Sequence, residues 1–164
     1  MPFATRADLL ARSNARRLFQ LAVPADMRMP PDDALRVAVE EGDLSGYTDA
    51  ERATLSAALS AIDTALTDAD ALLLSYGIPQ TVQTTLLARL ASTVALYNLQ
   101  GAERMTKEVQ TAYDGVMKTL TAHAAGQVNL IPAASTDPVR IDDVAFIESA
   151  PSRYGRRNLN EAGE

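Results

Sequence analysis

"YTDAERATLSAALSAIDTALTDADALLLSY", residues 47–76, carries the clearest structural signal of the chain. It begins with a capping box, in which the Thr48 hydroxyl accepts from a free backbone N–H and Glu51 accepts from the N–H of Thr48. Gly77 can end the helix by taking a positive φ. Apolar residues spaced by three and four predict one long amphipathic helix, with this face: Leu55, Leu59, Ile62, Leu66, Ala69, Leu73 and Tyr76.

Two more amphipathic helices are predicted after Gly77. The first has Pro79 in its opening turn, ends at Gly101, and carries an apolar face of Val82, Leu86, Leu90, Val94 and Tyr97. The second runs from Ala102 or Arg104 to Ala125, with an apolar face of Met105, Val109, Tyr113, Val116 and Leu120. Because three apolar faces joined by short turns must be buried against each other, we predict an all-α fold, a small antiparallel helical bundle.

Shorter elements are predicted ahead of residue 47. Thr5 with Asp8 can begin one short helix, and Ser13 or Asn14 can cap another that ends before Pro24. The following segment is rich in Pro, Gly and Asp and is expected to be mostly loop. Within it, the alternation of Leu35, Val37 and Val39 is compatible with a short strand or a short helix.

The chain after Gly126 has a different character, so we divide it into a helical domain, residues 1–126, and an extended arm, residues 127–164. Prolines and small polar residues separate two β-prone clusters there, and such long segments are either disordered or committed to a partner. The apolar content favours an arm that docks, for instance by strand addition. The candidate partner-binding residues are Val128, Leu130, Ile131, Val144, Phe146, Ile147, Arg153, Tyr154, Arg156 and Arg157.

Charge is unevenly distributed. The formal net charge of -6 disfavours a protein that wraps nucleic acid, yet residues 6–17 are basic and residues 32–70 are acidic. This pattern predicts charge contacts between neighbouring copies, and two solvated faces are the alternative. The candidates are Arg12, Arg16, Arg17, Asp63 and Asp70. No apolar run approaches the roughly 18 residues of a membrane span, and no signal peptide is evident, so a soluble cytosolic chain without membrane contact is expected.

Candidates for chemistry are few. His123 could be a general base or metal ligand, but no carboxylate stands at helical spacing from it, so a role at the helix end is favoured. The acidic pairs Asp32–Asp33, Glu40–Glu41 with Asp43, and Asp142–Asp143 lack the ligand alternation of a calcium loop and are interpreted as solvated charge. With no cysteine, no phosphate loop and no nucleophile elbow, we expect neither enzymatic activity nor a cofactor or metal.

Four stretches together resemble the Mu-like phage and prophage neck proteins, the head-tail connector or adaptor family. They are "FATRADLLARS", "AIDTALTDADALLLSY", "LLARLASTVALYNL" and "AYDGVMKTLTAHAAGQVNL", which lie between Phe3 and Leu130. The close of the last one matches the family pattern A-x-G-x-x-x-L through Ala124, Gly126 and Leu130. The C-terminal tail does not align with the family pattern.

The resemblance implies a structural protein of the virion neck, assembled in the host cytoplasm. Such an adaptor forms a ring below the portal protein, most often a dodecamer, and presents a surface to the next neck component or tail-terminator protein. DNA passes through its channel without sequence-specific binding. Two other classes stay open from the residues alone: a small helical regulator whose tail folds on a partner, and an enzyme using Asp63, Asp70 or His123.

Overall fold

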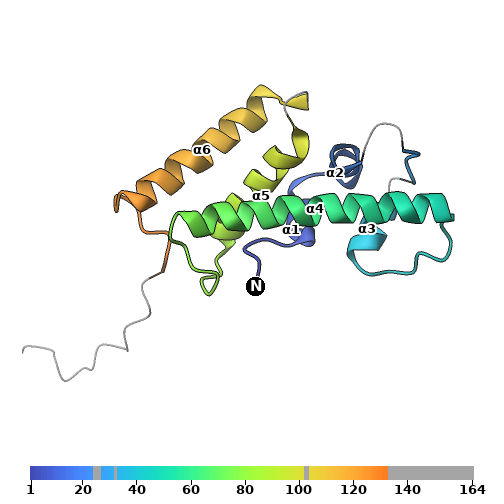
Figure 1. Cartoon of the computed structure of the whole chain (residues 1–164), viewed down its shortest axis with the longest axis horizontal. Coiled ribbons are helices and arrows are strands. Elements are labelled where there is room, and N and C mark those ends of the chain that lie inside the picture. The colour runs from blue at the N-terminus through green and yellow to red at the C-terminus, as the bar shows by residue number, and fades with distance from the viewer. Residues whose placement is uncertain (24–26, 32, 102–103, 133–164) are drawn as a thin grey trace, which may run out of the picture. The chain divides into compact units, whose positions relative to one another are not determined.

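Helices are the regular secondary structure of the described part of the chain. The computed structural model describes residues 1–23, 27–31, 33–101 and 104–132, and within these ranges it contains no strand (Figure 1). The all-α prediction is therefore confirmed. The helices are α1 (Arg6–Arg12), α2 (Ala15–Ala22), α3 (Ala34–Val39), α4 (Asp49–Ser75), α5 (Thr85–Gln100) and α6 (Lys107–Ala124).

Helix α4 is the long central element, and its two ends are those predicted. The Thr48 N–H donates to Glu51 Oε2 at 2.9 Å, and the Glu51 N–H donates to Thr48 Oγ1 at 3.4 Å, which completes the capping box. Gly77 ends the helix with a φ of 82°. Of the predicted apolar face, Leu55, Ile62, Leu66, Ala69 and Leu73 are buried, while Leu59 and Tyr76 are partly buried.

Helix α5 begins later than predicted, which changes its buried face. Pro79 lies in a turn, and its carbonyl oxygen accepts a hydrogen bond from the N–H of Val82 at 3.0 Å. The helix starts after Thr84, because this side chain caps it by accepting from the N–H of Leu87 at 3.1 Å. Leu87 is fully buried, whereas Leu86, which we assigned to the apolar face, is 45% exposed. The core positions are Leu87, Leu90, Ala91, Val94 and Ala95.

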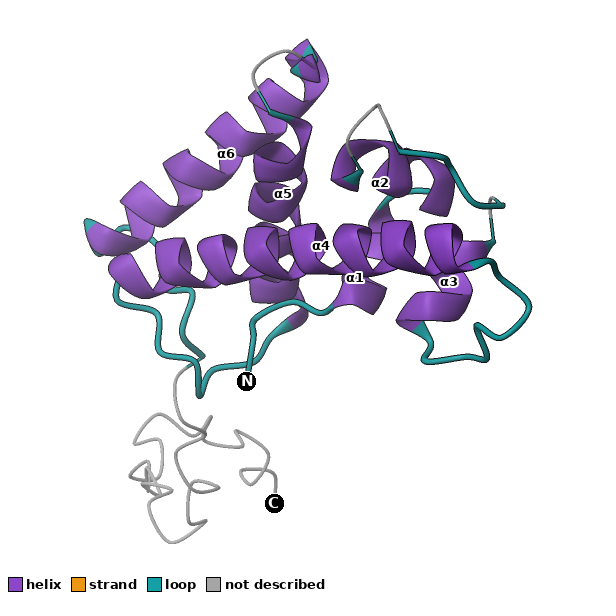
Figure 2. Cartoon of the chain, turned by 45° about the vertical axis from the view of Figure 1, so that its right-hand side comes forward, coloured by secondary structure: helices purple, strands orange, loops and turns teal. Residues whose placement is uncertain are grey.

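Helix α6 folds back against α5, with which it makes most of its helix contacts (Figure 2). It starts at Lys107 and not at Ala102 or Arg104, since Thr106 is its N-cap. Val116 and Leu120 are buried as predicted. Tyr113 stacks on Tyr97 of α5 with ring centroids 3.8 Å apart. These contacts hold the α5–α6 pair together.

The three short helices pack against α4 and α5 (Figure 1). Thr5 and Asp8 form the capping box of α1, and Asn14 caps α2 by accepting from the N–H of Arg17 at 2.7 Å. The 35–39 segment is helical, because Ala34, Leu35 and Ala38 are buried at helical spacing. One continuous core joins all six elements, and no described helix is long and apolar enough to cross a membrane.

Candidate interaction surface

The His123 ring contacts the backbone of the segment that follows α6. Its ring Nδ1 lies 3.1 Å from the Val128 carbonyl oxygen and 3.4 Å from the Leu130 nitrogen. One ring nitrogen either donates to that carbonyl or accepts from that N–H, so the tautomer decides which bond forms. Both partners lie beyond the helix, which differs from the terminal carbonyls we expected. Among the described residues, no group of His, Cys, Asp and Glu is arranged to hold a metal ion.

The first residues of the proposed arm are packed on the bundle. Gly126 takes a φ of 71°, and the N–H of Gln127 donates to the Ala122 carbonyl at 2.9 Å, which turns the chain back. Leu130 is 5% exposed within the core, whereas Val128 is 45% exposed. Of the other candidates, Ile131 is partly buried, and these lie outside the described residues: Val144, Phe146, Ile147, Arg153, Tyr154, Arg156 and Arg157.

Asp63 and Asp70 bind the N-terminal segment of their own chain. Arg6 donates through Nε and Nη2 to the two Asp63 carboxylate oxygens at 2.7 and 2.5 Å. The backbone N–H of Phe3 donates to Asp70 Oδ1 at 3.0 Å. Asp70 is only 8% exposed, so it does not belong to the solvated face that was the alternative to a charge contact. The arginines proposed as their counterparts, Arg12, Arg16 and Arg17, are exposed on α1 and α2.

Burial raises the pKa of the Asp70 carboxyl, and the hydrogen bond from Phe3 only partly opposes this. An acid with a raised folded-state pKa binds its proton more tightly in the folded chain than in the unfolded chain. Stability from this group is therefore fully present below the unfolded pKa of about 3.8 and is lost as the pH rises through the folded value.

Substituting Asp70 tests this balance. We expect Asp70→Ala to lower the free energy of unfolding by about 1–3 kcal/mol, because it leaves the buried Phe3 N–H without an acceptor. Asp70→Asn keeps an acceptor oxygen and removes the buried charge, so it should equal or exceed the wild type at neutral pH. Urea denaturation between pH 4 and 8 measures this. An advantage of Asp70→Asn that shrinks as the pH rises would contradict the assignment.

The loop carboxylates are solvated, as predicted. Glu40, Glu41 and Asp43 are exposed, and so is Asp33, while Asp32 and the 142–143 pair lie outside the described residues. Asp43 accepts hydrogen bonds from the Ser45 N–H at 2.8 Å and the Ser45 hydroxyl at 2.7 Å, and these lower the pKa of its carboxyl. The pairing is local to one turn.

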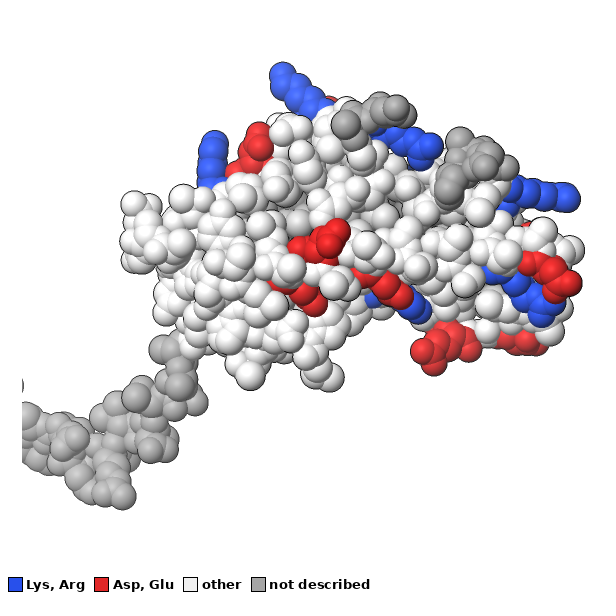
Figure 3. Space-filling view, viewed as in Figure 1, with Lys and Arg blue, Asp and Glu red and all other residues white. Residues whose placement is uncertain are grey.

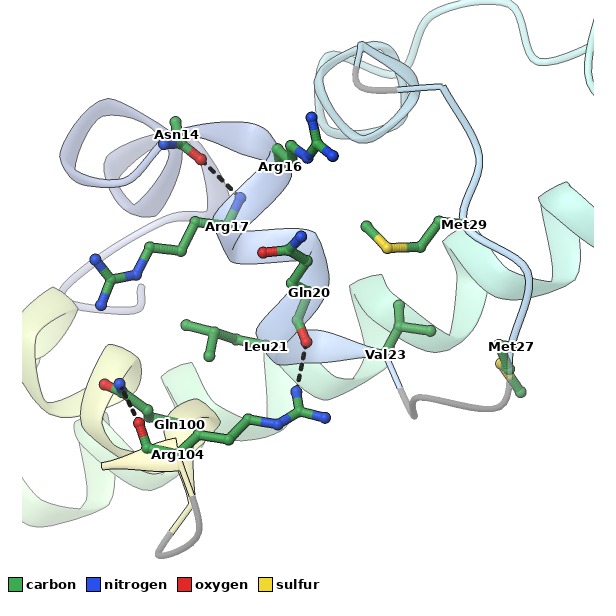
Figure 4. A pocket seen from close by; sticks show the side chains of 10 residues that line it. All are labelled: Asn14, Arg16, Arg17, Gln20, Leu21, Val23, Met27, Met29, Gln100 and Arg104. Atoms are coloured by element: carbon green, nitrogen blue, oxygen red, sulfur yellow. Dashed lines mark hydrogen bonds between the residues drawn. The ribbon is translucent and has the colours of Figure 1, made fainter. Parts of the chain in front are cut away.

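A groove of about 650 Å³ lies beside α2 (Figure 4). None of the described residues lining it is acidic. Three arginines and two glutamines carry hydrogen-bond donors, and four apolar side chains add apolar surface. The lining residues are Asn14, Arg16, Arg17, Gln20, Leu21, Val23, Met27, Met29, Gln100 and Arg104.

Tertiary packing builds this groove from segments far apart in the sequence. Arg104 Nη1 donates to the Gln20 carbonyl at 2.6 Å, where it satisfies one of the terminal carbonyls of α2. Gln100 is 5% exposed, and its Nε2 donates to the Arg104 carbonyl at 2.6 Å. These two hydrogen bonds connect α2 to the residues that follow α5, and Figure 4 shows both as dashed lines.

The groove combines positive charge with exposed apolar surface. Met27 and Met29 are 41% and 42% exposed, and the Met29 side chain points from its loop toward α2 (Figure 4). Lys and Arg side chains project along the edge of the molecule that carries α6 and α2 (Figure 3). Such a surface suits an extended segment carrying both carboxylates and apolar side chains.

From the sequence we named only Arg16 and Arg17 of this groove as candidates for intermolecular contacts. Met27 and Met29 stand in a segment that we expected to be mostly loop, and Gln100 and Arg104 stand at a helix end and a turn. The one available signal was the pair of arginines in the first turn of α2, where the positive end of the helix dipole disfavours cations.

Comparison with known proteins places the chain in a family. The sequence matches the family model described as bacteriophage Mu, Gp36, over residues 3–148. The match continues beyond Leu130, so the tail up to residue 148 does align, contrary to our expectation. A search of curated proteins found no match. Because the match covers most of the chain, the protein belongs to the bacteriophage Mu Gp36 family and is a Mu-like phage protein.

Proposed function

We propose that this protein is a structural component of the phage neck, a head-tail connector that forms a ring below the portal and links the capsid to the tail. The observation that carries the proposal is the family match, which spans both the bundle and part of the following segment. The helical bundle supplies a rigid subunit, and the residues after Pro132 supply contacts to the portal protein and to the neighbouring subunit. The next neck component or tail-terminator protein would bind the opposite face of the ring.

Two features of the bundle support this role. The chain leaves α6 at a fixed point, because Leu130 is buried in the core and His123 binds the backbone beside it. A segment that starts from a fixed point loses less freedom when it docks on a partner. A bundle carrying such a segment can make the same heterologous contact with each neighbour, and contacts of this type form a ring when the rotation between neighbours closes.

The charge of the chain also fits a channel. DNA moving through a neck must not adhere to its wall, and a net charge of -6 opposes adhesion to phosphates. We further propose that the protein acts without catalysis and without a cofactor. The described carboxylates with assigned partners serve capping, turns and ion pairs, which are structural tasks.

The proposal is tested by deleting the gene from a phage or prophage that carries it. Since a connector acts after heads and tails are made, induced lysates should contain DNA-filled heads and complete tails that are not joined. Electron microscopy of the lysate measures the joined fraction. Joined particles at the wild-type frequency would overturn the connector role.

A further inference from the structure

Two arginines of the groove stand where a cation does not stabilise its own helix. Arg16 and Arg17 occupy the first turn of α2, which contains no acidic residue. Cations are disfavoured there by the helix dipole, and acidic side chains are favoured. Departures of this kind from local preference are expected at functional positions. Together with Arg104 they line a groove whose described residues include no carboxylate.

The chain itself contains a segment of matching chemistry. Residues 139–148 read "VRIDDVAFIE", in which Asp142, Asp143 and Glu148 outnumber the single cation Arg140. Apolar residues flank the acidic pair, as apolar side chains flank the arginines in the groove. The family match ends at residue 148, so it includes this segment and excludes the basic "SRYGRR" beyond it.

Geometry favours the groove of another copy over that of the same chain. The groove lies near the start of α6, at Arg104, whereas Pro132 follows its end. The 18 residues of α6 span about 27 Å. The chain from Pro132 to Ile141 reaches about 30 Å at full extension. This length barely exceeds the length of α6, so the segment has little chain to spare for a path around the bundle. A neighbouring copy can present its groove at any closer distance.

We propose that residues 139–148 of one copy bind in the α2 groove of a second copy, with Asp142 and Asp143 against Arg17 and its neighbouring arginines and the apolar side chains against Met27 and Met29. This inference rests on the proposed ring and identifies its subunit contact. It replaces the acidic middle of α4 as the partner of the basic helix, since Asp63 and Asp70 already bind their own chain. Arg17→Glu should weaken the contact without harming α2, because its third position favours glutamate.

Disulfide cross-linking between two full-length chains tests the contact. Because the sequence contains no native cysteine, disulfides can form only at the introduced positions. One chain carries Met29→Cys, activated as a mixed aromatic disulfide, and the other carries Ala145→Cys and a size tag. We expect a disulfide-linked heterodimer at about ten times the yield obtained with Arg89→Cys, an exposed position on α5 outside the groove. Adding Arg17→Glu to the Met29→Cys chain should lower the yield to that of the control. Adding Asp142→Lys to the partner chain, with Asp143 kept for the remaining arginines, should then restore part of the yield.

Three results would overturn the proposal. They are equal yields from Met29→Cys and Arg89→Cys, no recovery in the charge-swapped pair, and, with both cysteines in one chain, a product that is monomeric at every concentration. The last result would place the segment in its own groove. Because the experiment contains no portal protein, its failure leaves the joining of heads and tails untouched, and the two proposals can fail separately.

Discussion

Replacing Leu87 with alanine is expected to lower the free energy of unfolding by about 2–5 kcal/mol, whereas replacing Leu86 should change it by about 0.5 kcal/mol or less. Leu87 is fully buried and Leu86 is 45% exposed. The alanine at position 87 loses the transfer free energy of the removed carbons and leaves a cavity between α5 and its neighbours. The alanine at position 86 removes carbons that already contact water.

The two variants differ only in which neighbouring leucine is shortened, so each is the control for the other. Both retain the Thr84 cap, and alanine suits a helix interior at either position. Urea denaturation followed by circular dichroism at 222 nm measures the difference. Equal losses, or a larger loss for Leu86→Ala, would show that α5 begins earlier and presents the face that the spacing from Val82 predicted.

Ending the chain after Pro132 is expected to leave the bundle folded and to lower its affinity for the portal protein by about 100-fold or more, which is about 2.7 kcal/mol. The compact unit of residues 1–132 contains the entire described core. The truncation removes Arg153, Arg156 and Arg157, which are proposed portal contacts, and it removes the 139–148 segment that is proposed to join the subunits. Each copy therefore loses its own contacts and also the avidity of an assembled ring. Pull-down and calorimetric titration against the purified portal measure the loss.

The choice of end point matters for this test. A chain ending at Gly126 would also lose Leu130, which is 5% exposed in the core, so a loss of binding could reflect lost stability. A chain ending at Glu148 keeps the apolar segment and loses Arg153, Arg156 and Arg157, so we expect an intermediate affinity. Undiminished binding by the chain that ends at Pro132 would show that the portal contacts lie on the bundle.

Local signals were enough to predict the fold class and most helix ends. The capping boxes at Thr5 and Thr48 and the glycine at position 77 each act within one turn, so their residue types suffice to identify them. The apolar face of α4 contains enough residues that one wrongly assigned position does not change the predicted helix. In α5 the spacing from Val82 selected the wrong leucine, because a one-residue shift moves a helix face by about 100° and only the Thr84 cap fixes the start.

The interaction surface depended on contacts that no local pattern encodes. Asp70 lies off the apolar stripe, yet the N-terminal segment folds over it and Phe3 satisfies its carboxylate. The α2 groove exists because Arg104 fastens the end of α5 to a carbonyl of α2 that is 84 residues away. Both depend on tertiary packing. The arginines at the start of α2 were visible in the sequence, but the bonds that Asp63 and Asp70 make with their own N-terminal segment were not.

The connector role is tested most directly by counting joined particles in lysates of the gene deletion, complemented in trans with the wild-type chain or with the chain that ends at Pro132. We predict separate filled heads and complete tails in the deletion, joined particles with the wild-type chain, and separate heads and tails again with the shortened chain. Joined particles in the uncomplemented deletion would contradict the connector role.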